Sequence, residues 1–134
     1  VLAFLMPIVA SMGGNAGMQT LAVAVRTIAT NDLTQNNFSS NVFKEFSIGI
    51  LNGIIFAVIS AFIVQIWFQD NILSIIIAIS MVLTMIIAGL FGILVPFTLK
   101  KMNIDPAIAS SVFVTTITDV IGFVSFLGVG AYFL

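Results

Sequence analysis

Apolar residues in this chain are collected into four long stretches that are separated by short polar ones. The stretches cover residues 1–29, 46–68, 72–99 and 107–134. Each is long enough to cross a bilayer as a helix, which needs about 20 residues. The pattern therefore predicts an all-α fold, a polytopic membrane helix bundle with four transmembrane helices.

The connections between these spans differ in character. Residues 30–43 are rich in Asn, Ser, Thr and Gln and predict a polar loop, whereas residues 69–71 predict a tight turn. Residues 100–106 form a short basic hairpin that ends in Asp105 and Pro106. Because Asp can cap free backbone N–H groups and proline at the first helical position loses no needed hydrogen bond, the fourth helix is expected to begin there.

Composition supports a single integral membrane domain over residues 1–134. Hydrophobic residues make up 60% of the chain and charged residues 7%, whereas a soluble domain carries about 25% charged residues. The net charge of −1 provides no basic surface for nucleic acid. Since Cys and His are absent, any metal must be held by oxygen ligands, which suit hard cations such as Mg²⁺.

The distribution of charge predicts the orientation. The four basic residues flank the first and third connections: Arg26, Lys44, Lys100 and Lys101. By the positive-inside rule, loops 30–45 and 100–106 are expected to be cytoplasmic and both termini external, in a multi-pass arrangement. A chain that starts outside without a signal peptide is expected to be a piece of a longer protein, with one earlier crossing absent.

Asp119 lies near the middle of the fourth span. A carboxylate at the bilayer centre costs about 2.5–3.5 kcal/mol on insertion scales, so such residues tend to face a bundle interior or a water-filled path. Small and hydroxylated residues recur at helical spacing on the same side: Ser111, Thr115, Thr118, Gly122 and Ser125. We therefore expect Asp119 to attract a cation, with Ser111, Thr115, Thr118 and Gly122 lining a pore.

The middle of the first span carries Gly13, Gly14 and Gly17 together with Asn15 and Gln19. One interpretation is a close helix crossing mediated by glycine. The other is a pore-lining segment, because polar groups at membrane depth are tolerated where they line a cavity. Asn15 and Gln19 lie one turn apart, which favours Asn15, Gly17 and Gln19 as pore-lining candidates.

Small residues in the second and third spans predict helix contacts. They repeat every four residues as Gly49, Gly53, Ala57 and as Thr84, Ala88, Gly92, and we interpret them as packing seams. Asn52 beside the first seam is expected to join helices by hydrogen bonding rather than to take part in transport. Pro96 predicts a kink or a helix stop.

An enzyme is the least expected class. There is no nucleophile beside a base, no phosphate-binding loop and no second carboxylate in the spans to share acid and base roles with Asp119. No organic cofactor is expected.

The order and spacing of several motifs resemble the transmembrane domain of MgtE-type magnesium channels. The residues that carry the resemblance are Pro7, the run Gly-Gly-Asn-Ala-Gly-Met-Gln-Thr at 13–20, Arg26, Lys44-Glu45, Gly49, Gly53, Asp105-Pro-Ala and Thr118-Asp-Val-Ile-Gly122. Together they cover essentially the whole chain.

The resemblance implies a homodimer in the inner (cell) membrane with an ion path at its twofold axis. Asp119 would then be the pore aspartate facing hydrated Mg²⁺, the transported ion, and Asn15 would line the path with it. The four spans would be the last four of five helices, and cytoplasmic regulatory domains of the same polypeptide would precede them.

Two other classes remain open from the residues themselves. In a proton- or sodium-coupled secondary transporter Asp119 would titrate, although the four spans hold no convincing internal repeat. In a non-transporting membrane subunit Asp119 would pair with a donor on another chain.

Overall fold

The computed structural model describes residues 2–29 and 38–133, apart from the side chains of residues 2–4 and 106–109. The described part forms four helices: α1 (Leu2–Ala29), α2 (Phe38–Phe68), α3 (Asn71–Lys101) and α4 (Pro106–Phe133). All four are long and apolar enough to cross a membrane. This confirms the expected all-α polytopic membrane bundle.

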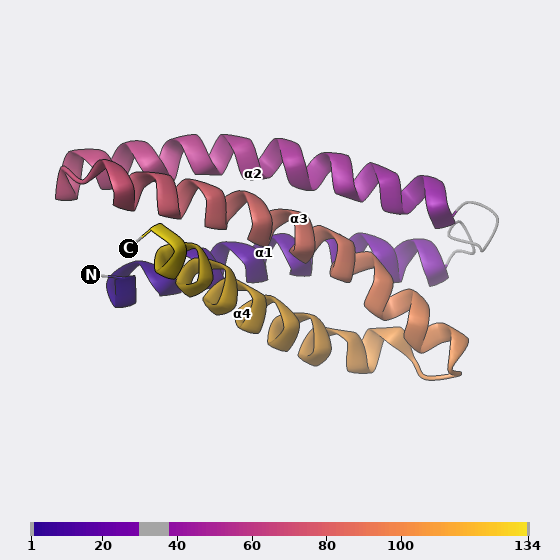
Figure 1. Cartoon of the computed structure of the whole chain (residues 1–134). Coiled ribbons are helices and arrows are strands. Elements are labelled where there is room, and N and C mark those ends of the chain that lie inside the picture. Colours follow the sequence, from indigo (N-terminus) through magenta and orange to yellow (C-terminus); the bar gives the residue numbers. More distant parts are fainter. Residues whose placement is uncertain (1, 30–37, 134) are drawn as a thin grey trace.

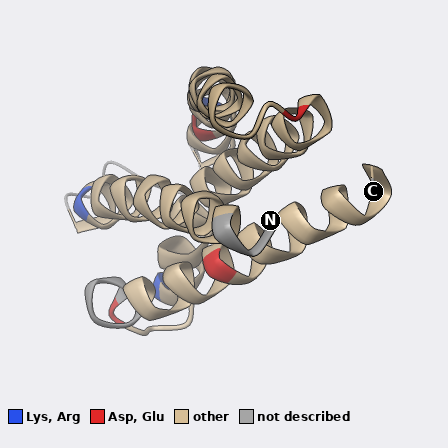
Figure 2. Ribbon diagram, turned by 90° about the vertical axis from the view of Figure 1, so that its left-hand side faces the viewer, with Lys and Arg blue, Asp and Glu red and all other residues tan. Residues whose placement is uncertain are grey.

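Successive helices run in opposite directions. One end of the bundle holds the end of α1, the start of α2 and the α3–α4 turn (Figure 1). The opposite end holds the start of α1, the α2–α3 turn and the end of α4. Arg26 in the last turn of α1 and Lys100 and Lys101 in the last turn of α3 therefore share an end. Charged positions are few along the ribbon (Figure 2).

The helix at the centre of the bundle is α3, which packs against each of the other three. Of its spanning segment 56% is buried, compared with 22% in α2 and in α4. The largest side chains that are completely covered include Ile76, Ile77 and Met81 of α3 and Phe126 of α4. The outer face of α2 is the opposite case, because Val58 and Phe62 are about two-thirds exposed and are suited to contact lipid.

Glycines allow α2 to lie directly on the backbone of α3. A Cβ atom added at Gly49 would lie 2.9 Å from the Cα atom of Ile86, and one added at Gly53 would lie 3.0 Å from the Cα atom of Val82. The seam predicted from the spacing of small residues is therefore a contact between these two helices.

One boundary was predicted wrongly, because α2 begins at Phe38 and not at residue 46. The Phe38 ring stacks on Phe97 of α3, with ring centroids 4.1 Å apart. Val42 packs on the same cluster, which includes Ile93 and Phe97. This apolar contact stabilises two helical turns before residue 46, where the sequence predicts a polar loop. The rest of that predicted loop, residues 30–37, lies outside the described part.

The earlier start changes the position of Glu45. This carboxylate lies inside α2, within a helix long enough to cross the membrane. Glu45 is therefore a second carboxylate in the helices of the bundle, whereas the sequence places it in the first connection.

The other helix ends agree closely with the sequence. Asp70 caps α3, since its Oδ1 atom accepts hydrogen bonds from the backbone N–H groups of Ile72 (3.0 Å) and Leu73 (3.2 Å), and α4 begins at Pro106 as expected. Pro96 is not a helix stop, because α3 continues through it to Lys101.

Gly49→Ala is expected to destabilise the bundle, because the new methyl group would meet backbone atoms of Ile86 that cannot move aside. Overpacking of this kind costs about 1–3 kcal/mol. Gly128→Ala is the matched control, since no heavy atom lies within 4 Å of its added Cβ. The thermal stability of both variants is measured by loss of the monodisperse size-exclusion peak after heating in detergent. Equal melting temperatures for Gly49→Ala and Gly128→Ala would contradict the close contact of α2 with α3.

Candidate functional site

The glycines of α1 lie where this helix contacts α3 and α4 at the same time. A Cβ atom added at Gly13 would lie 2.5 Å from Cγ2 of Thr84 in α3. One added at Gly17 would lie 2.9 Å from Cγ1 of Val114 and 3.1 Å from Cγ2 of Thr118 in α4. These residues therefore form a close helix crossing, within a helix that is continuous from Leu2 to Ala29.

The same contact buries two candidate residues of α4. A Cβ atom added at Gly122 would lie 3.0 Å from the Cα atom of Ala10, and Thr118 is 1% exposed, with its hydroxyl donating to the carbonyl oxygen of Thr115 (3.0 Å). Gly17, Thr118 and Gly122 thus hold α1 against α4 within the chain. Their assignment to a pore lining stays a prediction.

Polar groups of the two helices meet on the outer side of this contact. Asn15 and Thr115 are exposed and Asp119 is half-buried, and the Thr115 hydroxyl lies 3.8 Å from the sulfur atom of Met18. Because α1 and α4 run in opposite directions, Asn15, one turn before Met18, lies at the level of Asp119, one turn after Thr115. We call Asn15, Met18, Thr115 and Asp119 the outer strip.

Ser111, half-buried one turn before Thr115, extends the outer strip along α4. Within the described residues no hydrogen bond or ion pair reaches the Asp119 carboxylate, and no cluster of three or more Asp, Glu, His or Cys side chains occurs. The outer strip therefore presents a single carboxylate with neutral oxygen groups on the same two helices. Such a set suits a cation that keeps most of its water.

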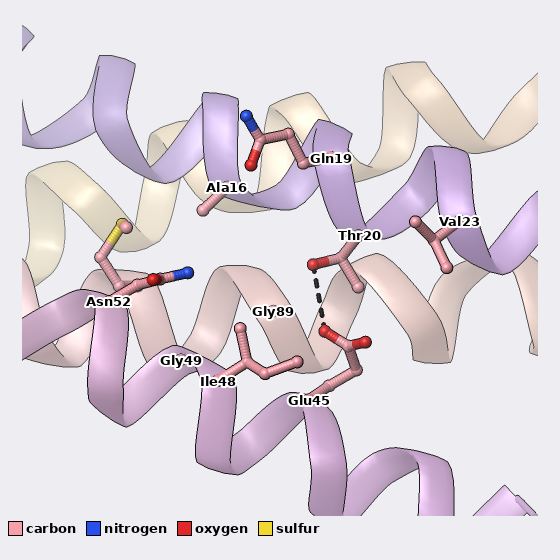
Figure 3. Close-up of a pocket in the computed structure, with 10 residues that line it drawn as sticks. Ala16, Gln19, Thr20, Val23, Glu45, Ile48, Gly49, Asn52 and Gly89 are labelled. Carbon is pink, nitrogen blue, oxygen red and sulfur yellow. Dashed lines mark hydrogen bonds between the residues drawn. The ribbon is translucent and has the colours of Figure 1, made fainter.

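The candidate Gln19 lies elsewhere, in a cleft between α1 and α2 (Figure 3). The cleft has a volume of about 180 Å³. Across it, the Thr20 hydroxyl donates to Oε2 of Glu45 at 3.3 Å. Its lining is formed by Ala16, Gln19, Thr20, Val23, Glu45, Ile48, Gly49, Asn52, Met85 and Gly89.

Three polar lining residues, Thr20, Glu45 and Asn52, were not recognised as site residues from the sequence. Glu45 was assigned to a loop, and Asn52 to a helix contact. The spacing of Glu45, Gly49 and Asn52 places them on one face of a helix, and this pattern becomes visible once α2 is known to begin at Phe38.

Comparison with known proteins identifies relatives over nearly the whole chain. A family model named MgtE and described as a divalent cation transporter matches residues 6–129. The chain is 35% identical over 133 residues to the magnesium transporter MgtE of Bacillus subtilis and 32% identical over 133 residues to that of Thermus thermophilus, covering 99% of this chain in each case. The corresponding protein of Enterococcus faecalis is 31% identical over 134 residues, or 100% of this chain.

The match covers only part of these relatives. The chain spans 30% of the length of the Bacillus and Enterococcus proteins and 29% of the Thermus protein.

The glycine contact predicts a difference between two neighbouring substitutions. Gly17→Ala is expected to lower thermal stability, because its methyl group would press on Val114 and Thr118. Gly14→Ala should be neutral or stabilising, since its added Cβ meets nothing within 4 Å and alanine is favoured over glycine in a helix by about 1 kcal/mol. Melting curves in detergent would reveal the difference, and the reverse order would argue against the crossing.

Proposed function

The chain belongs to the MgtE family of divalent cation transporters, and on this basis we propose that it carries Mg²⁺ across a membrane along the outer strip. The observation that carries the proposal is the half-buried Asp119 carboxylate at the middle of a spanning helix. The described residues give it no ion pair, and it lies one turn after Thr115 and at the level of Asn15. The names of the three relatives as magnesium transporters support the choice of ion.

The free energy of membrane insertion argues for a role in ion attraction. An acidic side chain at this depth costs about 2.5–3.5 kcal/mol. The Asp119 carboxylate has no hydrogen-bond partner among the described residues that would offset this cost within one protomer. A passing cation would supply the missing opposite charge.

We propose that two copies of the chain form the path. The outer strip faces away from its own bundle, so a second protomer related by a twofold axis can present an identical strip to it. Two Asp119 carboxylates would then face one divalent ion. A single carboxylate per path would leave the ion's charge only half compensated.

The ligand types explain how such a path can bind and still release Mg²⁺. This ion gives up its waters reluctantly and is usually held by one or two carboxylates with several waters retained. In the proposed path, Asp119 attracts the hydrated ion, while the Asn15 amide and the Thr115 hydroxyl accept or donate hydrogen bonds to its waters. Conduction needs a site that is attractive enough to admit the ion and weak enough to let it leave.

The basic residues are assigned a different role. Lys100 and Lys101 lie in the last turn of α3, outside the outer strip, and the Lys101 ammonium lies 5.0 Å from the centre of the Phe97 ring. We propose that they orient the bundle with this end in the cytoplasm.

Asp119→Asn is expected to reduce Mg²⁺ flux into liposomes by about tenfold or more, since interactions with a charged group contribute about 1.5–3 kcal/mol and 1.4 kcal/mol is a factor of ten. Asp70→Asn is the matched control, because Asp70 only caps α3 and asparagine caps equally well. Flux is measured with a Mg²⁺ gradient and no proton or sodium gradient. Normal flux in a folded Asp119→Asn protein would exclude the proposed role, and flux that requires a second gradient would indicate coupled transport.

Cross-linking tests the twofold arrangement. Because the chain has no native cysteine, Thr115→Cys provides a single thiol on the outer strip. Oxidation in membranes is expected to give covalent dimers readily with Thr115→Cys and poorly with Phe62→Cys, whose position on α2 is 66% exposed on an apolar face. Dimers from Phe62→Cys but not from Thr115→Cys would place the interface on the wrong helices.

A further inference from the structure

The cleft between α1 and α2 carries polar side chains on both walls, among apolar ones. Gln19 and Thr20 come from α1, Glu45 and Asn52 come from α2, and Gly89 of α3 lies in the lining between them (Figure 3). Neither helix packs closely on the other here, because both pack on α3 instead. The Thr20–Glu45 hydrogen bond is therefore a polar contact across an open space.

The charge at this cleft is not balanced. Glu45 is half-buried, and its carboxylate accepts one hydrogen bond, from the neutral Thr20 hydroxyl. Within the described part of the chain it forms no ion pair with a basic side chain. An ionisable residue in a spanning helix is expected to have a partner that compensates its charge, and the cleft leaves room for a mobile one.

The size and chemistry of the cleft select the class of ligand. Its volume of about 180 Å³ holds several waters, since a water occupies about 30 Å³ in the liquid. One carboxylate with hydroxyl and amide oxygens is a hard-oxygen set, which suits a hard cation. The scarcity of carboxylates favours a cation that keeps part of its hydration shell, as Mg²⁺ does.

We infer that this cleft is a second cation site in each protomer, in which Glu45 binds a partly hydrated divalent cation with help from Thr20, Gln19 and Asn52. The choice of Mg²⁺ as the physiological ion rests on the proposed function, but binding at the cleft does not. The site differs from the outer strip, because it lies within one protomer between α1 and α2 and uses a different carboxylate.

The test uses Mn²⁺ as a paramagnetic divalent probe and the purified protein in lipid nanodiscs. A nitroxide is attached at Val23→Cys, which lines the cleft, in a background carrying Asp119→Asn so that the outer strip does not contribute. Broadening of the nitroxide spectrum is expected to increase with Mn²⁺ concentration and then to saturate. Added Mg²⁺ should reverse the broadening, whereas Na⁺ at a concentration that supplies the same positive charge should not. A nitroxide at Phe62→Cys, on the outer face of α2, provides the background signal.

Two substitutions locate the binding. Glu45→Gln keeps the shape and an oxygen that can accept from Thr20 but removes the charge, and it should weaken Mn²⁺ binding about tenfold or more. Asn52→Leu keeps the carboxylate but fills the cleft with apolar atoms, and it should also weaken binding. Size-exclusion profiles check that each variant is folded.

Three results would overturn the inference: unsaturable broadening equal to that at Phe62→Cys, unchanged binding in both variants, or displacement of Mn²⁺ by Na⁺ as effectively as by Mg²⁺. Flux of Mg²⁺ is measured in parallel on the protein with Asp119 intact. Saturable binding at the cleft without any flux would contradict the transport proposal and leave the cleft site standing.

Discussion

The close contact of α1 with α3 and α4 is the constraint on which the rest of the arrangement depends. Gly13 and Gly17 leave no room for a side chain on that face of α1. The faces beside it must therefore carry the larger polar groups. Thr20 faces α2, where its hydroxyl donates to Glu45, and Gln19 lines the same cleft. Asn15 of the outer strip lies one turn before Gln19 and is exposed, so the two candidate sites share one helix.

The central position of α3 explains why a cleft exists at all. Glycines allow both α1 and α2 to approach α3 closely. A Cβ atom added at Gly92 of α3 would lie 2.7 Å from the Cβ atom of Thr20 in α1. Gly49 of α2 lies on the backbone of Ile86 in α3. Two helices that are each held tightly by a third need not touch each other. The lining of the space left between them includes four polar side chains, which a lipid-facing groove would not favour.

The two carboxylates of the spans illustrate different ways to place charge in a membrane bundle. Glu45 lies about two turns inside α2 and accepts a hydrogen bond from another helix. Asp119 lies near the middle of α4 and has no such partner among the described residues. Asp119 therefore has the higher expected free energy of insertion and the fewer polar partners. This combination is expected where a ligand supplies the opposite charge.

The amino-acid sequence by itself determined the number and type of the helices, the short turn at residues 69–71 and the start of α4 at Pro106, because apolar length, turn residues and helix-start signals are local properties. The early start of α2 could not be predicted in this way, since it depends on Phe38 stacking on Phe97 of α3. Likewise, the sequence could not show which helix lies against Gly17, and only the positions of Val114 and Thr118 show that α4 crosses α1 there. The pairing of Thr20 with Glu45, 25 residues away, was also decided by tertiary structure, because it arises from two helices that are held apart by a third.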